Sequence, residues 1–260
     1  MFNALVNGKL NTHGIEFTPV IADVEALNKM ALNAQLDVTK LSLNAFAFAA
    51  QPYQILNAGS ALGYNCGPLL VSKNKFTVDD IPNLKIAIPG KYTTANLLLT
   101  IFYPDATNKT EMIFSDIENA VLTQKVDAGL LIHENRFTYA QRGLHKILDV
   151  GEEWHKQTQK PLPLGCIAVK RTLYAEVKFA IDKLIAESVM YAFENKNQTM
   201  PYVTQHAQEM DKQVMMQHIN LYVTNASVNM GDDGKAAIEY LLHKGFEAKL
   251  LPQVNKIFVE

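Results

Sequence analysis

Residues 84–99 read LKIAIPGKYTTANLLL and combine the two patterns that decide the fold class. Residues 84–90 form a short apolar run that ends in Pro89 and Gly90, which predicts a buried strand followed by a turn. Residues 93–99 begin with two threonines and continue as an apolar run, which predicts a helix that starts close to the strand end. A strand, a turn and a helix in this order are typical of an α/β protein.

The same alternation continues along the chain in both directions. Strands are predicted at residues 15–21, 36–42, 67–72, 111–114, 128–132 and 162–169, and helices at residues 24–32, 117–124, 173–194, 202–221 and 235–243. Asp23 is the predicted N-cap of the helix at 24–32. The runs at 67–72 and 162–169 resemble each other, which indicates equivalent strands in two similar lobes. The sequence therefore predicts a two-lobed α/β protein with a ligand cleft.

Composition and charge narrow the class of protein. The 260 residues are 48% hydrophobic and 19% charged, and the formal net charge is -2. The sequence has no stripe of basic residues, so nucleic acid is not an expected partner. No apolar run reaches the length of a membrane span, and the first residues lack the pattern of a secretory signal. Cys66 and Cys166 lie far apart in the sequence, and nothing requires a disulfide between them. We therefore expect a cytoplasmic protein without membrane contact.

His133 is the strongest candidate for a catalytic residue. It directly follows the apolar run at 128–132, so it is expected at the end of a buried strand, where it faces a cleft. An imidazole in that place can act as a general base near neutral pH. The alternative is a histidine that is hydrogen-bonded at the edge of the core, and position alone leaves both interpretations open.

Two other places offer polar groups to a ligand. Lys40 and Ser42 lie at the C-terminal end of the strand predicted at 36–42, where α/β sheets present ligand groups. Thr93 and Thr94 lie at a helix N-terminus, whose unpaired N–H groups and hydroxyls suit an anion or a polar ligand.

Several kinds of site have no sequence support. The remaining histidines are scattered, and no H-E-x-x-H, C-x-x-C or carboxylate cluster has metal-ligand spacing, so no metal site is expected. No G-x-G-x-x-G is present, so no dinucleotide cofactor is expected. Structural roles are the default for His206, His218 and His243 on their predicted helices.

Sequence blocks spread along the chain resemble one enzyme family. The blocks are AGLLIHENRFTY at 128–139, DVGEEW at 149–154 with LPLG at 162–165, DVEALN at 23–28 with LDVTKLS at 36–42, HAQEM at 206–210 and HINLYV at 218–223. Together they are similar to the 1,4-dihydroxy-6-naphthoate synthases of the futalosine route to menaquinone, and the resemblance covers nearly the whole chain.

The resemblance implies a fold and a reaction. It implies a type-2 periplasmic-binding-protein-like fold, with residues 1–78 and 168–260 in one α/β lobe and residues 79–167 in the other. It implies a cytoplasmic lyase that converts cyclic dehypoxanthinyl futalosine into 1,4-dihydroxy-6-naphthoate and releases a three-carbon fragment, without metal or organic cofactor. His133 matches the family's proton acceptor. The positions that match its ligand contacts are Lys40, Leu41, Ser42, Thr93 and Thr94.

The beginning of the chain departs from the family pattern. Family members normally begin with a strand and a turn similar to Ser-Pro-Cys-Pro-Asn-Asp-Thr, whereas residues 1–8 read MFNALVNG and resemble the helix that follows that turn. Either the start lies upstream or this piece is lacking. We expect a chain without it to have lower stability and little activity.

Two alternatives to the lyase remain. One is a non-catalytic small-molecule receptor of the same fold, which would release its ligand unchanged. The other is the sibling enzyme that dehydrates chorismate in the same pathway, although the blocks around His133 and at 149–154 fit the naphthoate synthase better. Fold alone does not decide between them. The sequence does not indicate an oligomeric state.

Overall fold

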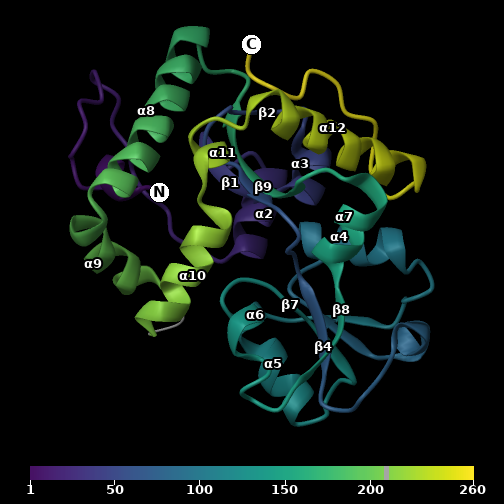
Figure 1. The fold of residues 1–260 in the computed structure, drawn as a ribbon. Coiled ribbons are helices and arrows are strands. Elements are labelled where there is room, and N and C mark those ends of the chain that lie inside the picture. The colour runs from purple at the N-terminus through teal and green to yellow at the C-terminus, as the bar shows by residue number, and fades with distance from the viewer. Residues whose placement is uncertain (208–210) are drawn as a thin grey trace.

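The computed structural model describes residues 1–207 and 211–260, which form helices packed around two β-sheets (Figure 1). The helices are α1 (Asn3–Val6), α2 (Val24–Leu32), α3 (Leu43–Ala49), the 3₁₀ helix η1 (Val78–Asn83), α4 (Thr94–Phe102), α5 (Phe114–Leu122), α6 (Asn135–Thr138), α7 (Val150–Thr158), α8 (Ala175–Glu194), α9 (Lys196–His206), α10 (Lys212–Tyr222), α11 (Asn225–Val228) and α12 (Gly231–Glu247). The strands are β1 (Val38–Ser42), β2 (Tyr53–Ile55), β3 (Ala61–Gly63), β4 (Leu69–Ser72), β5 (Ile86–Ile88), β6 (Lys109–Glu111), β7 (Ala128–Leu131), β8 (His145–Asp149) and β9 (Leu162–Lys170). Within the two described ranges, no helix combines the length and the apolar character that a membrane span requires.

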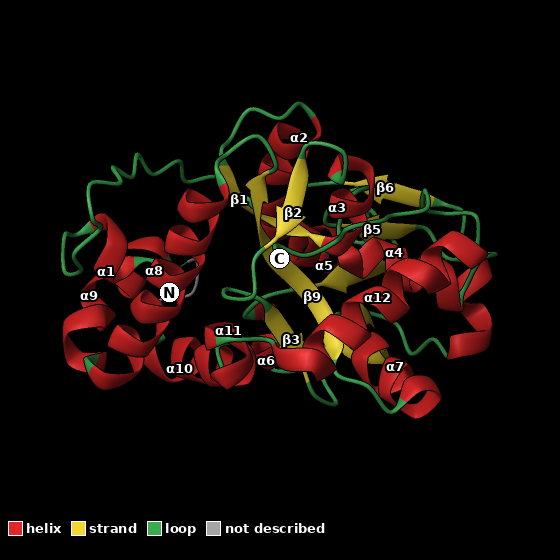
Figure 2. Ribbon diagram, turned by 90° about the horizontal axis from the view of Figure 1, so that it is seen from above, coloured by secondary structure: helices red, strands yellow, loops and turns green. Residues whose placement is uncertain are grey.

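The first sheet is built around β9. This strand pairs antiparallel with β1, β2 and β3, and its register places Leu41 opposite Cys166. Seven of the nine residues of β9 are buried, and α3 and α12 pack against it. Figure 2 shows β9 crossing the middle of the molecule, with α8 and α9 on one side and α4, α7 and α12 on the other. A strand that is covered in this way has no free edge.

The second sheet has the order β6-β5-β7-β4-β8. β5 runs parallel to β6 and β7, while β4 is antiparallel to both β7 and β8. The strand and helix that residues 84–99 predict are present as β5 and α4, and the strand predicted at 128–132 is β7. Together the two sheets confirm the α/β class.

The membership of the strands in the two sheets shows where the chain crosses from one sheet to the other. β4 belongs to the second sheet and the whole of β9 to the first, so the connections between the sheets run through residues 64–68 and 150–161. The sequence-based lobe boundaries, near residues 78 and 168, remain a prediction. β4 and β9 each lie between two strands to which they are antiparallel. This shared position supports the prediction that they are equivalent strands of two similar lobes.

The strand predicted at residues 15–21 is a loop. Ile15 and Phe17 are half-buried against the core cluster that contains Ile181 of α8, whereas Val20 and Ile21 are 50% and 66% exposed. The apolar alternation therefore reflects packing of a loop on a helix, and no neighbouring strand pairs with it. The strand predicted at 111–114 is also displaced, since β6 ends at Glu111 and α5 begins at Phe114.

The helix predicted at residues 202–221 corresponds to two helices. α9 ends at His206, and α10 begins at Lys212 after Asp211, whose side chain accepts hydrogen bonds from Gln213 N and Val214 N. Residues 208–210, the end of the sequence block at 206–210, lie outside the described residues. Asp23 caps α2 as predicted, because its side chain accepts from the amides of Glu25 and Ala26.

The main core joins both sheets. It includes Tyr53 and Phe46 from the first sheet's side, and Ile86 and Leu130 from the second sheet. Trp154 is 1% exposed, and its indole N–H donates to the carbonyl oxygens of Lys160 and Pro161. A shared core of this kind holds the sheets in one arrangement, so the space between them can form a defined cavity.

Candidate active site

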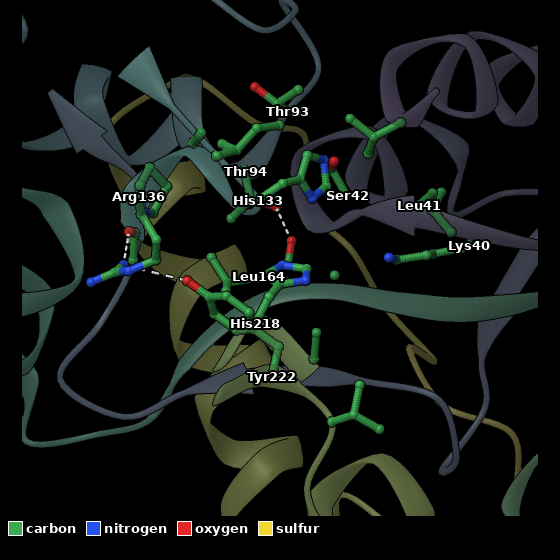
Figure 3. Close-up of a pocket in the computed structure, with 18 of the residues that line it drawn as sticks. Lys40, Leu41, Ser42, Thr93, Thr94, His133, Arg136, Leu164, His218 and Tyr222 are labelled. Atoms are coloured by element: carbon green, nitrogen blue, oxygen red, sulfur yellow. Dashed lines mark hydrogen bonds between the residues drawn. The ribbon is translucent and has the colours of Figure 1, made fainter. Parts of the chain in front are cut away.

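A cavity of about 170 Å³ lies between the two sheets (Figure 3). Its wall combines β1, β3, β9, the N-terminus of α4, the segment after β7, α6 and α10. The sequence-predicted site residues all lie in this wall: Lys40, Leu41, Ser42, Thr93, Thr94 and His133. The fold thus brings together residues that are up to 93 positions apart in the sequence.

The end of β1 is held in place by a chain of buried polar groups. Ser42 N donates to Oδ1 of Asn28 at 2.9 Å, and Nδ2 of Asn28 donates to Oγ of Ser42 at 3.2 Å. Nδ2 of Asn28 also donates to Oε2 of Glu25 at 2.9 Å, while Oε1 of Glu25 accepts from Tyr92 N at 3.1 Å. α2 therefore fixes the strand end at Ser42 relative to the turn that precedes α4.

Lys40 brings a cationic group to the cavity. Figure 3 shows Lys40 and Arg136 entering from opposite sides, with His133 and His218 between them. In the described part of the chain, Lys40 Nζ makes no hydrogen bond or ion pair. Although much of the side chain is accessible from the cavity, desolvation by the surrounding protein lowers the pKa of Lys40, and the charge of Glu134 partly opposes this effect. An unpaired cation in a cavity attracts an anionic ligand.

The hydroxyls of Thr93 and Thr94 are already engaged with the protein. Thr93 Oγ1 donates to Gly90 O at 2.8 Å and, as N-cap of α4, accepts from Asn96 N at 3.2 Å. Thr94 Oγ1 donates to Leu164 O at 2.7 Å and accepts from Leu43 N at 3.0 Å. Each hydroxyl has a single proton, so neither can donate to a ligand without losing a protein contact.

His133 has the left-handed backbone conformation, with φ of 59°. This conformation is uncommon for a residue with a Cβ and is concentrated at functional sites. The ring centroid of His133 lies 4.8 Å from that of Phe114, which packs edge-on against it. Burial, and then the charges of Lys40 and His218, lower the pKa of His133 to about 3. The imidazole is therefore neutral at neutral pH and can accept a proton.

His218 and Tyr222 complete the wall from α10. The His218 ring centroid is 6.0 Å from that of His133 and 5.1 Å from that of Tyr222. Burial lowers the pKa of His218 in spite of the opposing charge of Glu134, and burial raises the pKa of Tyr222 to about 12. From its position on a predicted helix, His218 was expected to have a structural role. The spacing of four residues between the two rings, which places them on one helix face, is the signal that could have identified them.

Arg136 is fixed on the opposite side of the cavity. Its guanidinium pairs with Oδ2 of Asp149 at 3.1 Å and donates to the carbonyl oxygen of Gly67 and to the Tyr222 hydroxyl. Asp149 in turn caps α7 by accepting from Gly151 N at 2.8 Å. Arg136 lies three residues after His133 in the chain, inside the block at 128–139, but its type and position alone did not separate it from a surface arginine.

The described residues offer no cluster suited to a metal ion. In residues 1–207 and 211–260, no three His, Cys, Asp or Glu side chains are placed to hold one. Both thiols, Cys66 and Cys166, are free and buried, and burial raises the pKa of each. A raised thiol pKa disfavours the reactive thiolate. The polar groups that line the cavity include the two imidazoles, Lys40, Arg136 and Tyr222.

Comparisons with known proteins agree with the fold and connect the chain to a pathway. A family model described as menaquinone biosynthesis matches residues 1–247. The 1,4-dihydroxy-6-naphthoate synthase of Thermus thermophilus is 36% identical over 261 residues, which cover 100% of this chain and 94% of that protein. The crystal structure of a protein from Archaeoglobus fulgidus has a TM-score of 0.91 at 37% identity and covers 96% of this chain and 93% of its own.

A more distant likeness concerns the fold alone. The alkanesulfonate-binding protein of Xanthomonas axonopodis has a TM-score of 0.64 at 12% identity, over 90% of this chain and 82% of its own. This likeness confirms the predicted periplasmic-binding-protein-like fold. The resemblance to menaquinone-pathway enzymes is confirmed by the family match and by the relative from Thermus.

Proposed function

The chain belongs to the menaquinone biosynthesis family, and from this membership we propose that it is a lyase that converts cyclic dehypoxanthinyl futalosine into 1,4-dihydroxy-6-naphthoate. The observation that carries the proposal is the 36% sequence identity to a named naphthoate synthase, which extends over the whole chain. A cavity between the two sheets is consistent with a small-molecule substrate. We place the reaction in the cytoplasm, as the family resemblance implies.

His133 is the proposed general base. Its ring faces the cavity from the end of β7 and is neutral near pH 7, because burial and the charge of Lys40 lower its pKa to about 3. A weak base of this kind becomes stronger when an anion binds nearby, since the anion offsets the charge of Lys40. Substrate binding and base activation would then be linked through the same cation.

Lys40 is the proposed partner of the substrate carboxylate. Because Lys40 Nζ has no ion pair within the described residues, a bound carboxylate would form one without displacing a protein group. Leu41 and Ser42 are proposed contacts beside it, at the end of β1. A charge-assisted hydrogen bond of this kind contributes about 1.5–3 kcal/mol.

Thr93 and Thr94 are proposed contacts at the N-terminus of α4, where Thr94 offers its backbone amide. The amide of Asn96 already donates to the Thr93 hydroxyl. The amides of Thr94 and Ala95 are therefore the remaining donors in the first turn of α4. Both residues line the cavity. The N-terminus of α4 would therefore hold a polar or anionic part of the substrate with N–H groups.

The proposed cleavage requires few kinds of catalytic group. The cleavage is driven by aromatisation of the ring system and requires a base, a shaped pocket and hydrogen bonds to the departing three-carbon fragment. A positioned general base contributes roughly 10²–10⁴-fold to the rate. Fixed orientation inside the cavity contributes further.

The test is an assay of the wild-type protein, including any segment encoded upstream of Met1, with cyclic dehypoxanthinyl futalosine and no added cofactor, with His133→Asn in parallel. Asparagine tolerates the left-handed backbone but is not a base, so the variant isolates the chemistry from the strain. We expect naphthoate from the wild type and a rate at least about 10²-fold lower from the variant. A folded wild-type chain that forms no naphthoate, and instead releases the compound unchanged or dehydrates chorismate, would overturn the proposal.

A further inference from the structure

A second imidazole faces the cavity beside His133, and it has a carboxylate partner. His218 Nδ1 lies 3.4 Å from Oε1 of Glu134, and the two side chains are only 23% and 16% exposed. Glu134 directly follows His133 in the chain, whereas His218 comes from α10. Among the described residues, His133 has no such carboxylate within ion-pair distance. Two imidazoles with different surroundings therefore share one cavity.

We propose that His218 is a second proton-transfer group of this site and that Glu134 is the residue that positions it. A carboxylate at Nδ1 favours the tautomer with its proton on Nδ1 and holds the ring in one orientation. Nε2, on the far side of the ring, is then the nitrogen that can exchange a proton with a ligand. The proposal rests on the proposed lyase reaction, for which it adds a proton donor.

The surroundings of the two rings assign them opposite roles. Burial and the charges of Lys40 and His218 disfavour the imidazolium form of His133, and among the described residues no carboxylate lies within ion-pair distance of its ring. His218 also faces cations, but the charge of Glu134 favours its imidazolium form. Two titratable groups whose environments separate them in this way are typical of an acid and base pair. His133 is then the acceptor and His218 the donor.

Three charged groups from outside α10 act on His218. Lys40 of β1 and Arg136 of α6 oppose its protonation, Glu134 favours it, and Tyr222 on its own helix is neutral because its pKa is raised to about 12. A substrate carboxylate beside Lys40 would offset that cation. The imidazolium form of His218 is therefore more accessible in the substrate complex than in the free protein.

The proton count of the reaction requires a donor. The carbon–carbon bond between the ring system and the three-carbon fragment breaks, and its electron pair stays with the fragment. The ring system gives up one proton to His133 as it becomes aromatic, and the fragment takes one proton from Nε2 of the His218 imidazolium. No oxidant or reductant is consumed. After the step His133 is protonated and His218 is neutral, and one proton transferred between the rings, directly or through solvent, restores the starting state.

The experiment compares the wild-type chain with His218→Gln, Glu134→Gln and a matched surface control. The control is His243→Gln, because His243 Nε2 lies 3.3 Å from Oε1 of Glu247 in an exposed pair on α12. We expect His218→Gln to lower kcat about 10²-fold with little change in KM, since the lost group acts in the chemical step. Glu134→Gln should lower kcat about tenfold, and His243→Gln should leave it unchanged.

Two readouts separate proton transfer from a structural role. The fall of kcat at high pH, where the His218 imidazolium loses its proton, should disappear in His218→Gln and move to lower pH in Glu134→Gln. Added imidazole should raise the rate of His218→Ala, whose short side chain leaves room for it, at least about tenfold, and should not raise the rate of His218→Gln, whose side chain fills that space. Thermal unfolding shows whether each variant is folded before its kinetics are compared.

The outcomes distinguish this inference from the proposed function. If the wild type forms naphthoate and a folded His218→Gln has the same kcat and pH profile, His218 is not a proton-transfer group and the lyase assignment stands. If His218→Gln alone fails to fold, the pH profile of Glu134→Gln and the rescue of His218→Ala decide the matter. If the folded wild type forms no naphthoate, the lyase assignment fails and this inference fails with it.

Discussion

Thr94 Oγ1 donates a hydrogen bond of 2.7 Å to the carbonyl oxygen of Leu164, which joins the N-terminus of α4 to β9 across the floor of the cavity. The same hydroxyl accepts from the amide of Leu43 at the start of α3. One buried side chain therefore connects α4, β9 and α3, of which α4 and β9 line the site. This arrangement makes Thr94 a structural support, in addition to its proposed role at the helix N-terminus.

Replacement of Thr94 tests this support. Thr94→Val keeps the shape but leaves Leu43 N–H and Leu164 C=O without their partner, so the free energy of unfolding should fall by about 1–3 kcal/mol. Thr94→Ser keeps the hydroxyl and should lose less than about 1 kcal/mol. Urea denaturation of both variants measures the difference. A valine variant as stable as the serine variant would show that the two bonds contribute nothing.

A second structural prediction concerns Gly90 and Glu25. A Cβ added to Gly90 would lie 2.4 Å from Cδ of Glu25, and the glycine has φ of 144°. Gly90→Ala should therefore destabilise the chain by about 2–4 kcal/mol, from backbone strain and overpacking together. Gly143 is the control, since its φ is 78° but no atom lies within 4 Å of the added Cβ. Gly143→Ala should lose only about 1 kcal/mol, and equal losses in urea denaturation would contradict the proposed clash.

The fold was largely predictable because its local signals agree with its tertiary contacts. Residues 84–99 form β5 and α4, since the apolar run, the turn and the threonine cap all favour the same structure. The prediction failed at residues 15–21, where Ile15 and Phe17 belong to a loop that packs against a core cluster shared by α8 and β9. Period alone does not separate a strand from a loop that lies on a helix.

The site was predictable in part for a similar reason. Strand ends and helix starts are visible in a sequence, so Lys40, Ser42 and His133 could be placed near one cleft. The four-residue spacing of His218 and Tyr222 places both rings on one face of α10, but which surface that face meets depends on how the C-terminal helices pack against the rest. His218 and Tyr222 were therefore missed, although both line the cavity.

The buried ion pair between Arg136 and Asp149 should contribute to the stability of the folded chain. The two side chains are 13% and 3% exposed, so removal of the cation would leave the carboxylate buried without its charged partner. Arg136→Met should lower the free energy of unfolding by about 3 kcal/mol. Adding Asp149→Asn should recover part of that loss, because the buried charge is then gone. A double-mutant cycle with simply additive losses would show that the pair is not coupled.

Lys40→Met should weaken substrate binding and change the titration of His133. Loss of a charge-assisted bond to the substrate carboxylate should raise KM about 10–100-fold. The charge of Lys40 lowers the pKa of His133, so its removal should move the acid limb of kcat/KM to higher pH. Lys75→Met, at an exposed position, is the control and should change neither quantity. An unchanged KM would exclude Lys40 as the carboxylate partner.

The titration of His133 should also be visible in stability. Its pKa is lowered from 6.5 to about 3 in the folded chain, so between these values the unfolded chain binds a proton that the folded chain does not. The free energy of unfolding should therefore decrease as pH falls from about 6.5 towards 3, by at most about 1.4 kcal/mol per pH unit from this group. His133→Asn has no such titration, so the difference in stability between wild type and variant should shrink or reverse as pH falls. Urea denaturation across this range measures it, and a difference that is independent of pH would mean that His133 titrates at its ordinary pKa in the folded chain.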